Sequence, residues 1–231
     1  MADNRCVILF VKFPERGKVK SRLAQDMDGD IIQRFYECMV LDAIDMLKQA
    51  GTPFRICFDP PDAQERVRQW LGQTYLYMPQ IGGNLGERMK QAFSIVFSEG
   101  VDEALLIGSD IPALTTILID EAFQSLSDRD SVIGPANDGG YYLIGFKKIT
   151  FVPGIFHAMA WSTNTVFRET VRRLKETSLT VHLLPELTDI DTREDVEAFL
   201  SHALLATLDA PRTLLFLNKH HQMLFKPQKK I

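Results

Sequence analysis

The fold class of this chain is decided by residues 105–112, whose sequence is LLIGSDIP. Apolar residues run here without alternation, which is typical of a strand that is buried on both faces of a parallel sheet. Asp110 is the first charged residue after the run, and Pro112 prevents the chain from continuing as a central strand. The segment therefore predicts a buried parallel strand that ends at a carboxylate.

Further strands and helices are predicted on both sides of this segment. Strands are expected at residues 6–11, 54–58, 75–78, 104–108, 131–134 and 180–184, with a further one at 141–146 after a Gly-Gly turn. Helical stripes lie between them at 32–47, 85–96, 167–174 and 196–204, and capping boxes open two of these, Asn84 with Glu87 and Thr192 with Asp195. Alternating strands and helices predict an α/β fold, a mostly parallel sheet with helices on both faces.

Length and composition agree with one such domain. The chain has 231 residues, of which 45% are hydrophobic and 24% charged, and this excludes collagen, disordered chains and disulfide mini-proteins. No linker or repeat interrupts it, so we expect one domain over residues 1–210 and a C-terminal extension at 211–231. The extension is apolar with scattered basic residues, which indicates packing on the domain or on a second copy in a homodimer.

The N-terminus and the cysteines indicate a cytoplasmic protein. The first apolar run covers only residues 6–11, too short for a signal peptide or an integral membrane segment. The three cysteines, Cys6, Cys38 and Cys57, have no metal-binding spacing, and each lies in an apolar segment where a structural role is expected.

The charges are segregated along the chain. The net charge is −4, which argues against a general nucleic-acid binder. Residues 12–22, KFPERGKVKSR, nevertheless carry five cations directly after the first strand, Lys12, Arg16, Lys18, Lys20 and Arg22. A basic loop at the head of a parallel sheet suits a polyphosphate, although a solvated basic loop is the alternative. It matches neither GxxxxGK[ST] nor GxGxxG.

Two further loops also follow strands. In residues 79–86, PQIGGNLG, Gly82 and Gly83 allow a ligand to approach the backbone and Gln80 offers an amide to a base edge, although a plain turn before a helix fits equally. Carboxylates recur at the other strand ends, at Asp110, Asp138, Asp189 and Asp191. Such acids can hold Mg²⁺ together with substrate phosphates, whereas Asp110 alone could simply cap a helix.

Five ordered motifs resemble a known family. They are FVKFPERGKVKSRLA, GGNLGERM, GSDIP, DGGYYLIG and DIDTRED, spread over about residues 5–200. They resemble the DUF2064 group of glycosyltransferase-like bacterial proteins, of the nucleotide-diphospho-sugar transferase superfamily with the GT-A fold. The chain is more distantly similar to phospholactate and molybdenum-cofactor guanylyltransferases.

The resemblance implies roles for individual residues. Lys20 and Arg22 would be catalytic, Lys12, Arg16 and Lys18 would bind phosphate, and Gln80, Gly82 and Gly83 would bind base and ribose. Asp110 and Asp191 would hold Mg²⁺ or Mn²⁺, and Asp138, Gly139, Gly140 and Trp161 would hold the acceptor.

The resemblance also implies a reaction. We expect metal-dependent transfer of a nucleotidyl group from a nucleoside triphosphate to a small phosphorylated or carboxylated acceptor, with release of pyrophosphate. The alternatives are a glycosyltransferase that uses an NDP-sugar and a nucleotide-binding regulatory module without turnover. Pro112 replaces the second acid of the Asp-x-Asp usual in sugar transferases, and KVKSR replaces the Gly-x-Gly-Thr-Arg usual in sugar nucleotidyltransferases.

Overall fold

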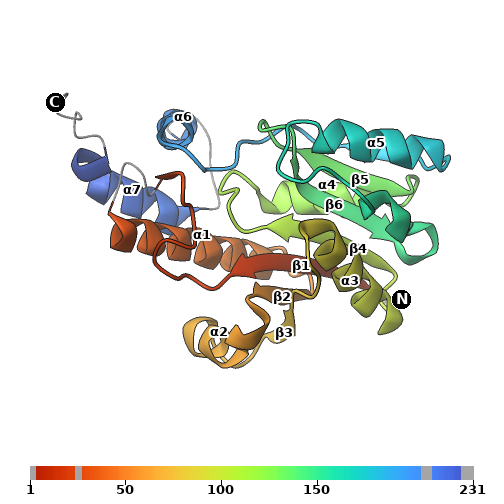
Figure 1. Ribbon diagram of the computed structural model, residues 1–231, viewed down its shortest axis with the longest axis horizontal. Coiled ribbons are helices and arrows are strands. Elements are labelled where there is room, and N and C mark those ends of the chain that lie inside the picture. Colours follow the sequence, from red (N-terminus) through yellow and green to blue (C-terminus); the bar gives the residue numbers. More distant parts are fainter. Residues whose placement is uncertain (1–3, 24–27, 204–209, 225–231) are drawn as a thin grey trace.

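The centre of the described chain is one mixed sheet (Figure 1). The computed structural model describes residues 4–23, 28–203 and 210–224. Within these residues the strands are β1 Arg5–Lys12, β2 Phe54–Asp59, β3 Leu76–Pro79, β4 Glu103–Gly108, β5 Ser131–Pro135, β6 Tyr141–Lys147 and β7 Val181–Leu183. Every expected strand is present, and no strand end is shifted by more than one residue.

The strand order is β3-β2-β1-β4-β6-β5-β7. β1 lies between β2 and β4, and its Val7 stands opposite Phe54 on one side and Leu105 on the other. β6 alone among these strands is antiparallel to its neighbours, β4 and β5. The carboxyl ends of β1, β2, β3 and β4 therefore lie at one edge of the sheet, where α/β proteins bind their ligands.

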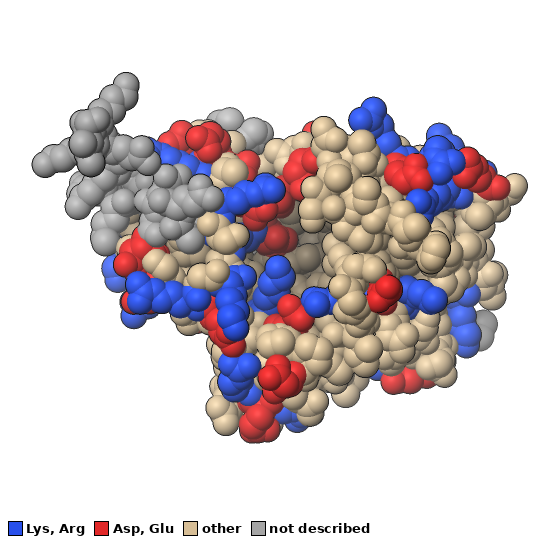
Figure 2. Space-filling view, in the orientation of Figure 1, with Lys and Arg blue, Asp and Glu red and all other residues tan. Residues whose placement is uncertain are grey.

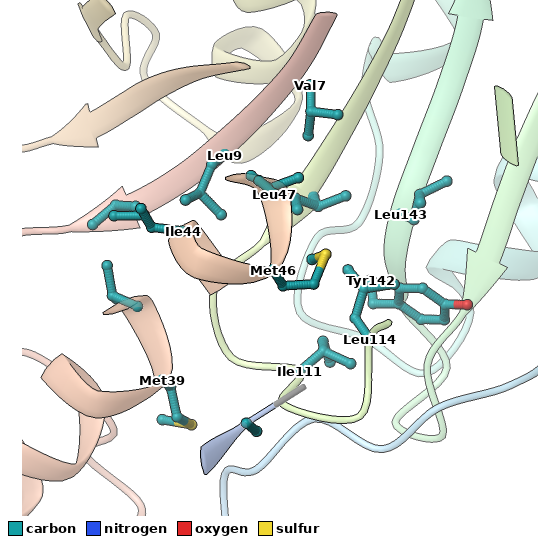
Figure 3. Packing of buried hydrophobic residues seen from close by; sticks show 14 of the residues in the cluster. Val7, Leu9, Met39, Ile44, Met46, Leu47, Ile111, Leu114, Tyr142 and Leu143 are labelled. Carbon is teal, nitrogen blue, oxygen red and sulfur yellow. The ribbon is translucent and has the colours of Figure 1, made fainter. Parts of the chain in front are cut away.

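Helices cover both faces of the sheet. They are α1 Gly29–Gln49, α2 Gln64–Leu71, α3 Leu85–Ser98, α4 Thr116–Ser125, α5 Val166–Glu176, α6 Arg193–Ala203 and α7 Pro211–Leu224. Alternate side chains of β1 enter different hydrophobic clusters, Val7 and Leu9 on one face and Cys6 and Ile8 on the other. The first cluster packs under α1, α2, α4, α6 and α7, and the second under α3 and α5. Figure 3 shows part of the first cluster, where Leu9 of β1 lies beside Ile44 of α1. The expected α/β architecture is confirmed.

Both predicted capping boxes are present. Asn84 accepts a hydrogen bond from the Glu87 N–H at 3.0 Å, and Thr192 accepts one from the Asp195 N–H at 3.2 Å. α2, α4 and α7 were not predicted as helices. α2 buries only Val67 and Leu71, so its apolar stripe is too short to recognise. α4 begins without a side-chain cap.

The segment after residue 210 contains a helix, α7, which lies along α1 (Figure 1). Leu217 is fully buried in the first cluster, whereas Leu215 on the same helix is exposed. The rest of the expected extension, residues 225–231, lies outside the described residues. None of the described helices is long and apolar enough to cross a membrane.

Candidate functional site

A cleft of about 620 Å³ lies at the carboxyl ends of β1 and β4. Figure 2 shows a hollow near the centre of the face, with basic and acidic side chains gathered around it. The lining includes, from the loop after β1 to the segment before α6, Lys12, Lys18, Lys20, Ser21, Arg22, Tyr36, Gln80, Leu85, Arg88, Met89, Ser109, Asp110, Tyr141, Tyr142, Ser162 and Asp191. The basic loop after β1, Asp110 at the end of β4 and Asp191 before α6 thus meet in one cleft, although they are far apart in sequence.

Lys20 lies at the centre of this arrangement. Its ammonium Nζ is 2.9 Å from Asp110 Oδ2 and 2.6 Å from Asp191 Oδ1. The Lys20 side chain is only 4% exposed, whereas those carboxylates are 37% and 33% exposed. One buried cation therefore joins two carboxylates that still face the cleft.

Lys20 and its acidic partners stabilise one another's charges. Burial alone would lower the pKa of Lys20, but the negative charges of Asp110 and Asp191 outweigh burial, and the pKa lies above its ordinary value. Burial would likewise raise the pKa of Asp110, yet the charge and hydrogen bond of Lys20 keep that pKa below its ordinary value. Lys20 and Asp110 are therefore both ionised at neutral pH.

The basic loop is attached to the core on both sides of Lys20. Val19 and Leu23 are 3% and 1% exposed and belong to the first hydrophobic cluster. Lys20 itself has a φ of 48°, in the left-handed region that non-glycine residues seldom adopt. Because Val19 and Leu23 hold the backbone, the Lys20 side chain is directed inward at the two carboxylates.

Backbone contacts bring Asp191 beside Asp110. The Ile190 N–H donates to the carbonyl oxygen of Asp110 at 3.2 Å, and the Ile190 side chain is fully buried. The Asp195 carboxylate accepts from the backbone N–H of Asp191 at 3.1 Å and of Thr192 at 2.7 Å. Asp110 is not a helix cap, because the residue that precedes α4 is Thr115.

A third carboxyl group, Asp189, lies close to these acids. Burial raises its pKa to about 6, and the charges of Asp138, Asp191 and Asp110 act in the same direction. Lys20 acts in the opposite direction but does not outweigh them. The Asp189 carboxyl group therefore keeps its proton more readily than an ordinary aspartate does.

The residues expected to hold a metal fit that role in their chemistry. Carboxylate oxygens are the ligands that Mg²⁺ and Mn²⁺ prefer, and those of Asp110 and Asp191 converge on a single point, now taken by Lys20 Nζ. Among the described residues, no group of three or more His, Cys, Asp or Glu side chains could hold a metal. The pair therefore suits a cation that takes its remaining ligands from substrate phosphate or water.

The loop expected to read the base lies beside the cleft. Gln80 is 5% exposed and lines the cleft, but its amide donates to the backbone oxygen of Cys57 at 2.9 Å. Gly82 and Gly83 are not among the lining residues; the Gly83 N–H donates to Glu87 Oε2 at 2.7 Å. Gly82 has a φ of 145°, and a Cβ there would collide with the backbone of Arg88. Both glycines thus shape the start of α3.

The expected acceptor residues lie next to the cleft and do not line it. Asp138 accepts from the Gly140 N–H at 2.7 Å, and Gly139 has a φ of 86°. A Cβ on Gly139 would overlap the backbone of Asn164, so this turn packs against the segment that carries Trp161. Trp161 packs over Gly86 of α3, while its neighbour Ser162 lines the cleft.

The structure does not bring Arg16 to the cleft. Its guanidinium lies 3.4 Å from Asp30 and 3.9 Å from Asp28, at the start of α1. Lys12, Lys18 and Arg22 do line the cleft, and Arg22 lies 4.0 Å from Asp191.

Sequence reasoning did not single out Arg88, Tyr36 or Ser109 as site residues. Arg88 lines the cleft from α3 and forms an ion pair with Asp59 at 3.0 Å. The Tyr36 hydroxyl accepts from the Lys12 N–H at 2.8 Å and lies 3.2 Å from Ser109 Oγ. Both Arg88 and Tyr36 lie on amphipathic helices, where an aromatic or basic side chain gives no signal of its own. Only Ser109, next to Asp110, could have been found from position.

Comparisons with known proteins match the chain to a protein family and to solved structures. A family model described as an uncharacterized protein conserved in bacteria (DUF2064) matches residues 41–163. The crystal structure of a candidate nucleotide-diphospho-sugar transferase from Desulfovibrio desulfuricans G20 is similar at a TM-score of 0.92 and 35% identity, over 96% of this chain and 97% of that one. A search of curated proteins gave no match.

More distant structures share the fold. A 4-diphosphocytidyl-2C-methyl-D-erythritol synthase from Anaerococcus prevotii DSM 20548 is 10% identical with a TM-score of 0.57, over 87% of this chain and 98% of that one. Rv0371c from Mycobacterium tuberculosis H37Rv, solved in complex with manganese, is 15% identical with a TM-score of 0.54, over 87% of this chain and 100% of that one. At these identities the similarity shows the fold alone.

Proposed function

This chain belongs to the DUF2064 family and has the nucleotide-diphospho-sugar transferase fold, and from that premise we propose that it is a nucleotidyltransferase. The reaction would transfer a nucleotidyl group from a nucleoside triphosphate to a small phosphorylated or carboxylated acceptor and release pyrophosphate. The similarity to a candidate nucleotide-diphospho-sugar transferase and to a 4-diphosphocytidyl-2C-methyl-D-erythritol synthase supports a transferase in general.

The charge balance of the cleft carries this proposal. Of the described residues that line it, five are basic, Lys12, Lys18, Lys20, Arg22 and Arg88, and two are acidic, Asp110 and Asp191. Such an excess of cations suits a ligand with many negative charges, and a triphosphate carries more than a sugar diphosphate. Pro112 also leaves Asp110 without the second acid of an Asp-x-Asp.

The side chains of this chain would act by position and charge. Lys12 and Lys18 would bind the outer phosphates, while Lys20 and Arg22 would stabilise the negative charge that develops on the phosphate under attack. No protein nucleophile is needed, because an acceptor oxygen attacks the α-phosphorus in line with the departing pyrophosphate. Tyr141, Tyr142 and Ser162 line the cleft and would, with Asp138, Gly139, Gly140 and Trp161 behind them, form the acceptor side.

A divalent cation would be held by Asp110 and Asp191. When bound, it would supply charge stabilisation to phosphate oxygens. Mn²⁺ in the structure of Rv0371c from Mycobacterium tuberculosis supports Mg²⁺ or Mn²⁺ as the cation here.

One observation favours the alternative, glycosyl transfer from an NDP-sugar. The solved protein that is 35% identical to this chain is itself named as a nucleotide-diphospho-sugar transferase candidate. The same carboxylates would then hold the cation against a diphosphate, and the five cations of the cleft would exceed what that ligand requires.

Product analysis tests the proposal. The protein is incubated with Mg²⁺, each of the common nucleoside triphosphates or NDP-sugars, and a panel of phosphorylated and carboxylated acceptors. We expect pyrophosphate with one triphosphate, and a loss of about a hundredfold or more in its rate of release in Asp110→Asn. Release of free NDP from an NDP-sugar would establish the alternative, and binding without either product would indicate a regulatory module.

A further inference from the structure

We propose that the Lys20 ammonium competes with a divalent metal for the position between Asp110 and Asp191 and must leave it before the metal enters, so that metal binding is coupled to phosphate binding. This inference rests on the proposed function, because it assigns a regulatory device to the same site. It gives Lys20 two successive partners, first the carboxylates and then the phosphates.

The first step of the argument is geometric. Lys20 Nζ lies 2.9 Å from Asp110 Oδ2 and 2.6 Å from Asp191 Oδ1, so both carboxylates direct an oxygen at the same point. A cation held by those two oxygens would lie within a few ångströms of the ammonium. Two positive charges at that separation repel each other strongly in a partly buried site, so the two states exclude each other.

The second step concerns burial. The Lys20 side chain is 4% exposed, which means that water does not compete with the carboxylates for its ammonium. The carboxylates are 37% and 33% exposed and remain open to the cleft. A metal can therefore reach the acids from the cleft, but it must displace a cation that is shielded from solvent.

The third step is that displacement requires only a side-chain movement. Val19 and Leu23 stay anchored in the core, and the flexible side chain of Lys20 lies in the wall of the cleft. Phosphate oxygens in the cleft would offer the ammonium new acceptors in exchange for the two carboxylates. A triphosphate thereby removes the block on the metal position, and each ligand raises the affinity of the other.

The test measures metal binding without nucleotide. Free Mn²⁺ is titrated by electron paramagnetic resonance into the wild-type protein and into Lys20→Met, which keeps the side-chain length and removes the charge. We expect Lys20→Met to bind Mn²⁺ about tenfold more tightly than the wild type, or better. Lys20→Gln, whose neutral amide can still donate to one carboxylate, should also bind Mn²⁺ more tightly than the wild type. It replaces Lys20→Met in the titration if Lys20→Met does not fold.

Two matched variants isolate the cause. Lys18→Met removes the same charge from the same loop, but the ion pair that Lys18 forms among the described residues is with Glu15 rather than with Asp110 or Asp191. We expect it to leave the Mn²⁺ affinity within about twofold of the wild type, because exposed charges are well screened. Adding Asp110→Asn to Lys20→Met should abolish the gain, which would place the extra binding at these acids.

Three results overturn the proposal: an unchanged or weaker Mn²⁺ affinity in Lys20→Met, an equal gain in Lys18→Met, or a gain that survives Asp110→Asn. None of them depends on turnover. A protein that released no pyrophosphate but showed the tighter Mn²⁺ binding in Lys20→Met would retain this coupling and lose the proposed reaction. Pyrophosphate release by the wild type, with an unchanged Mn²⁺ affinity in Lys20→Met, would retain the proposed reaction and refute this coupling.

Discussion

At the scale of single residues, Tyr36 connects the parts of the cleft that carry opposite charge. Its ring is buried on α1, and its hydroxyl meets the Lys12 backbone from one strand end and the Ser109 side chain from another. Burial raises the pKa of Tyr36 to about 12, so the hydroxyl stays protonated at neutral pH. A residue on a helix therefore contacts the ends of both β1 and β4 at the cleft.

The substitution Tyr36→Phe should lower the free energy of unfolding by about 2 kcal/mol, because the Lys12 N–H and the Ser109 hydroxyl lose a partner inside the protein. Urea denaturation measures the change. Tyr77→Phe is the control, since that hydroxyl donates to the Gly72 carbonyl in a half-buried position, and about 1 kcal/mol or less is expected. Equal losses in the two variants would contradict the connecting role of Tyr36.

The residues that sequence reasoning could find are those marked by position and charge. Asp110 follows an apolar run, and Lys20 lies in a basic loop, so both were expected at the site and both line the cleft. The contact of Lys20 with both Asp110 and Asp191 could not be predicted. These acids are brought together by a backbone hydrogen bond between segments that are distant in sequence. Arg16 belongs to the same basic loop and yet pairs with Asp30 outside the cleft.

At the scale of elements, the start of α7 is held by an acid from another helix. Asp42 of α1 is 2% exposed, and its carboxylate accepts from the backbone N–H of Thr213 at 2.8 Å and of Arg212 at 3.2 Å. The first N–H groups of a helix have no partner within the helix, and a carboxylate is their strongest acceptor. Local capping signals do not reveal such a cap, because the acid lies 170 residues before Arg212 in the chain.

Asp42→Ala should lower the free energy of unfolding by about 2 kcal/mol, since it removes a cap whose hydrogen bonds are buried. Asp45→Ala is the matched control, because Asp45 contacts the same Arg212 at 2.6 Å but is 36% exposed. An exposed ion pair contributes less than about 1 kcal/mol. Thermal and urea unfolding of both variants compare them, and a larger loss in Asp45→Ala would refute the cap.

α5 gives a pH dependence at the same scale. Glu169 forms hydrogen bonds and ion pairs with Arg172 and Arg173, and these lower its pKa from 4.5 to about 2. Because the folded pKa is depressed, the stabilisation is present above pH 4.5 and is lost as the pH falls to about 2. Glu169→Gln should therefore be less stable than the wild type at about pH 7, and the difference in melting temperature should disappear near pH 2. A difference that stayed constant with pH would contradict the pairing.

The strands and most helices could be predicted from local pattern. A buried strand such as Glu103–Gly108 is marked by an uninterrupted apolar run, and α3 by its stripe and its Asn84 cap. α4 has only a short apolar stripe, and no side-chain cap marks its start. Its stability comes from Ile119, Ala122 and Phe123 in the first cluster, which only the folded chain brings together.

At the scale of the whole molecule, the net charge of −4 conceals a basic loop and two carboxylates that meet at the strand ends. The sheet order puts β1, with its basic loop, directly beside β4, with its carboxylate. That adjacency follows from long-range strand pairing and could be expected only from the fold class. The cleft also requires Asp191, directly before α6, so a segment near the end of the chain completes a site that begins at the first strand.

The packing of α7 decides whether this helix belongs to the domain of its own chain. Leu217 is 1% exposed and Leu215 is 71% exposed, although they lie on the same helix. Packing on the chain's own α1 predicts that Leu217→Ala lowers the free energy of unfolding by about 3 kcal/mol and that Leu215→Ala changes it by less than about 0.5 kcal/mol. Docking on a second copy would make the loss vary with protein concentration, because association then contributes to stability. Urea unfolding of both variants at two protein concentrations about a hundredfold apart decides between the two arrangements, and we expect the same midpoint at both.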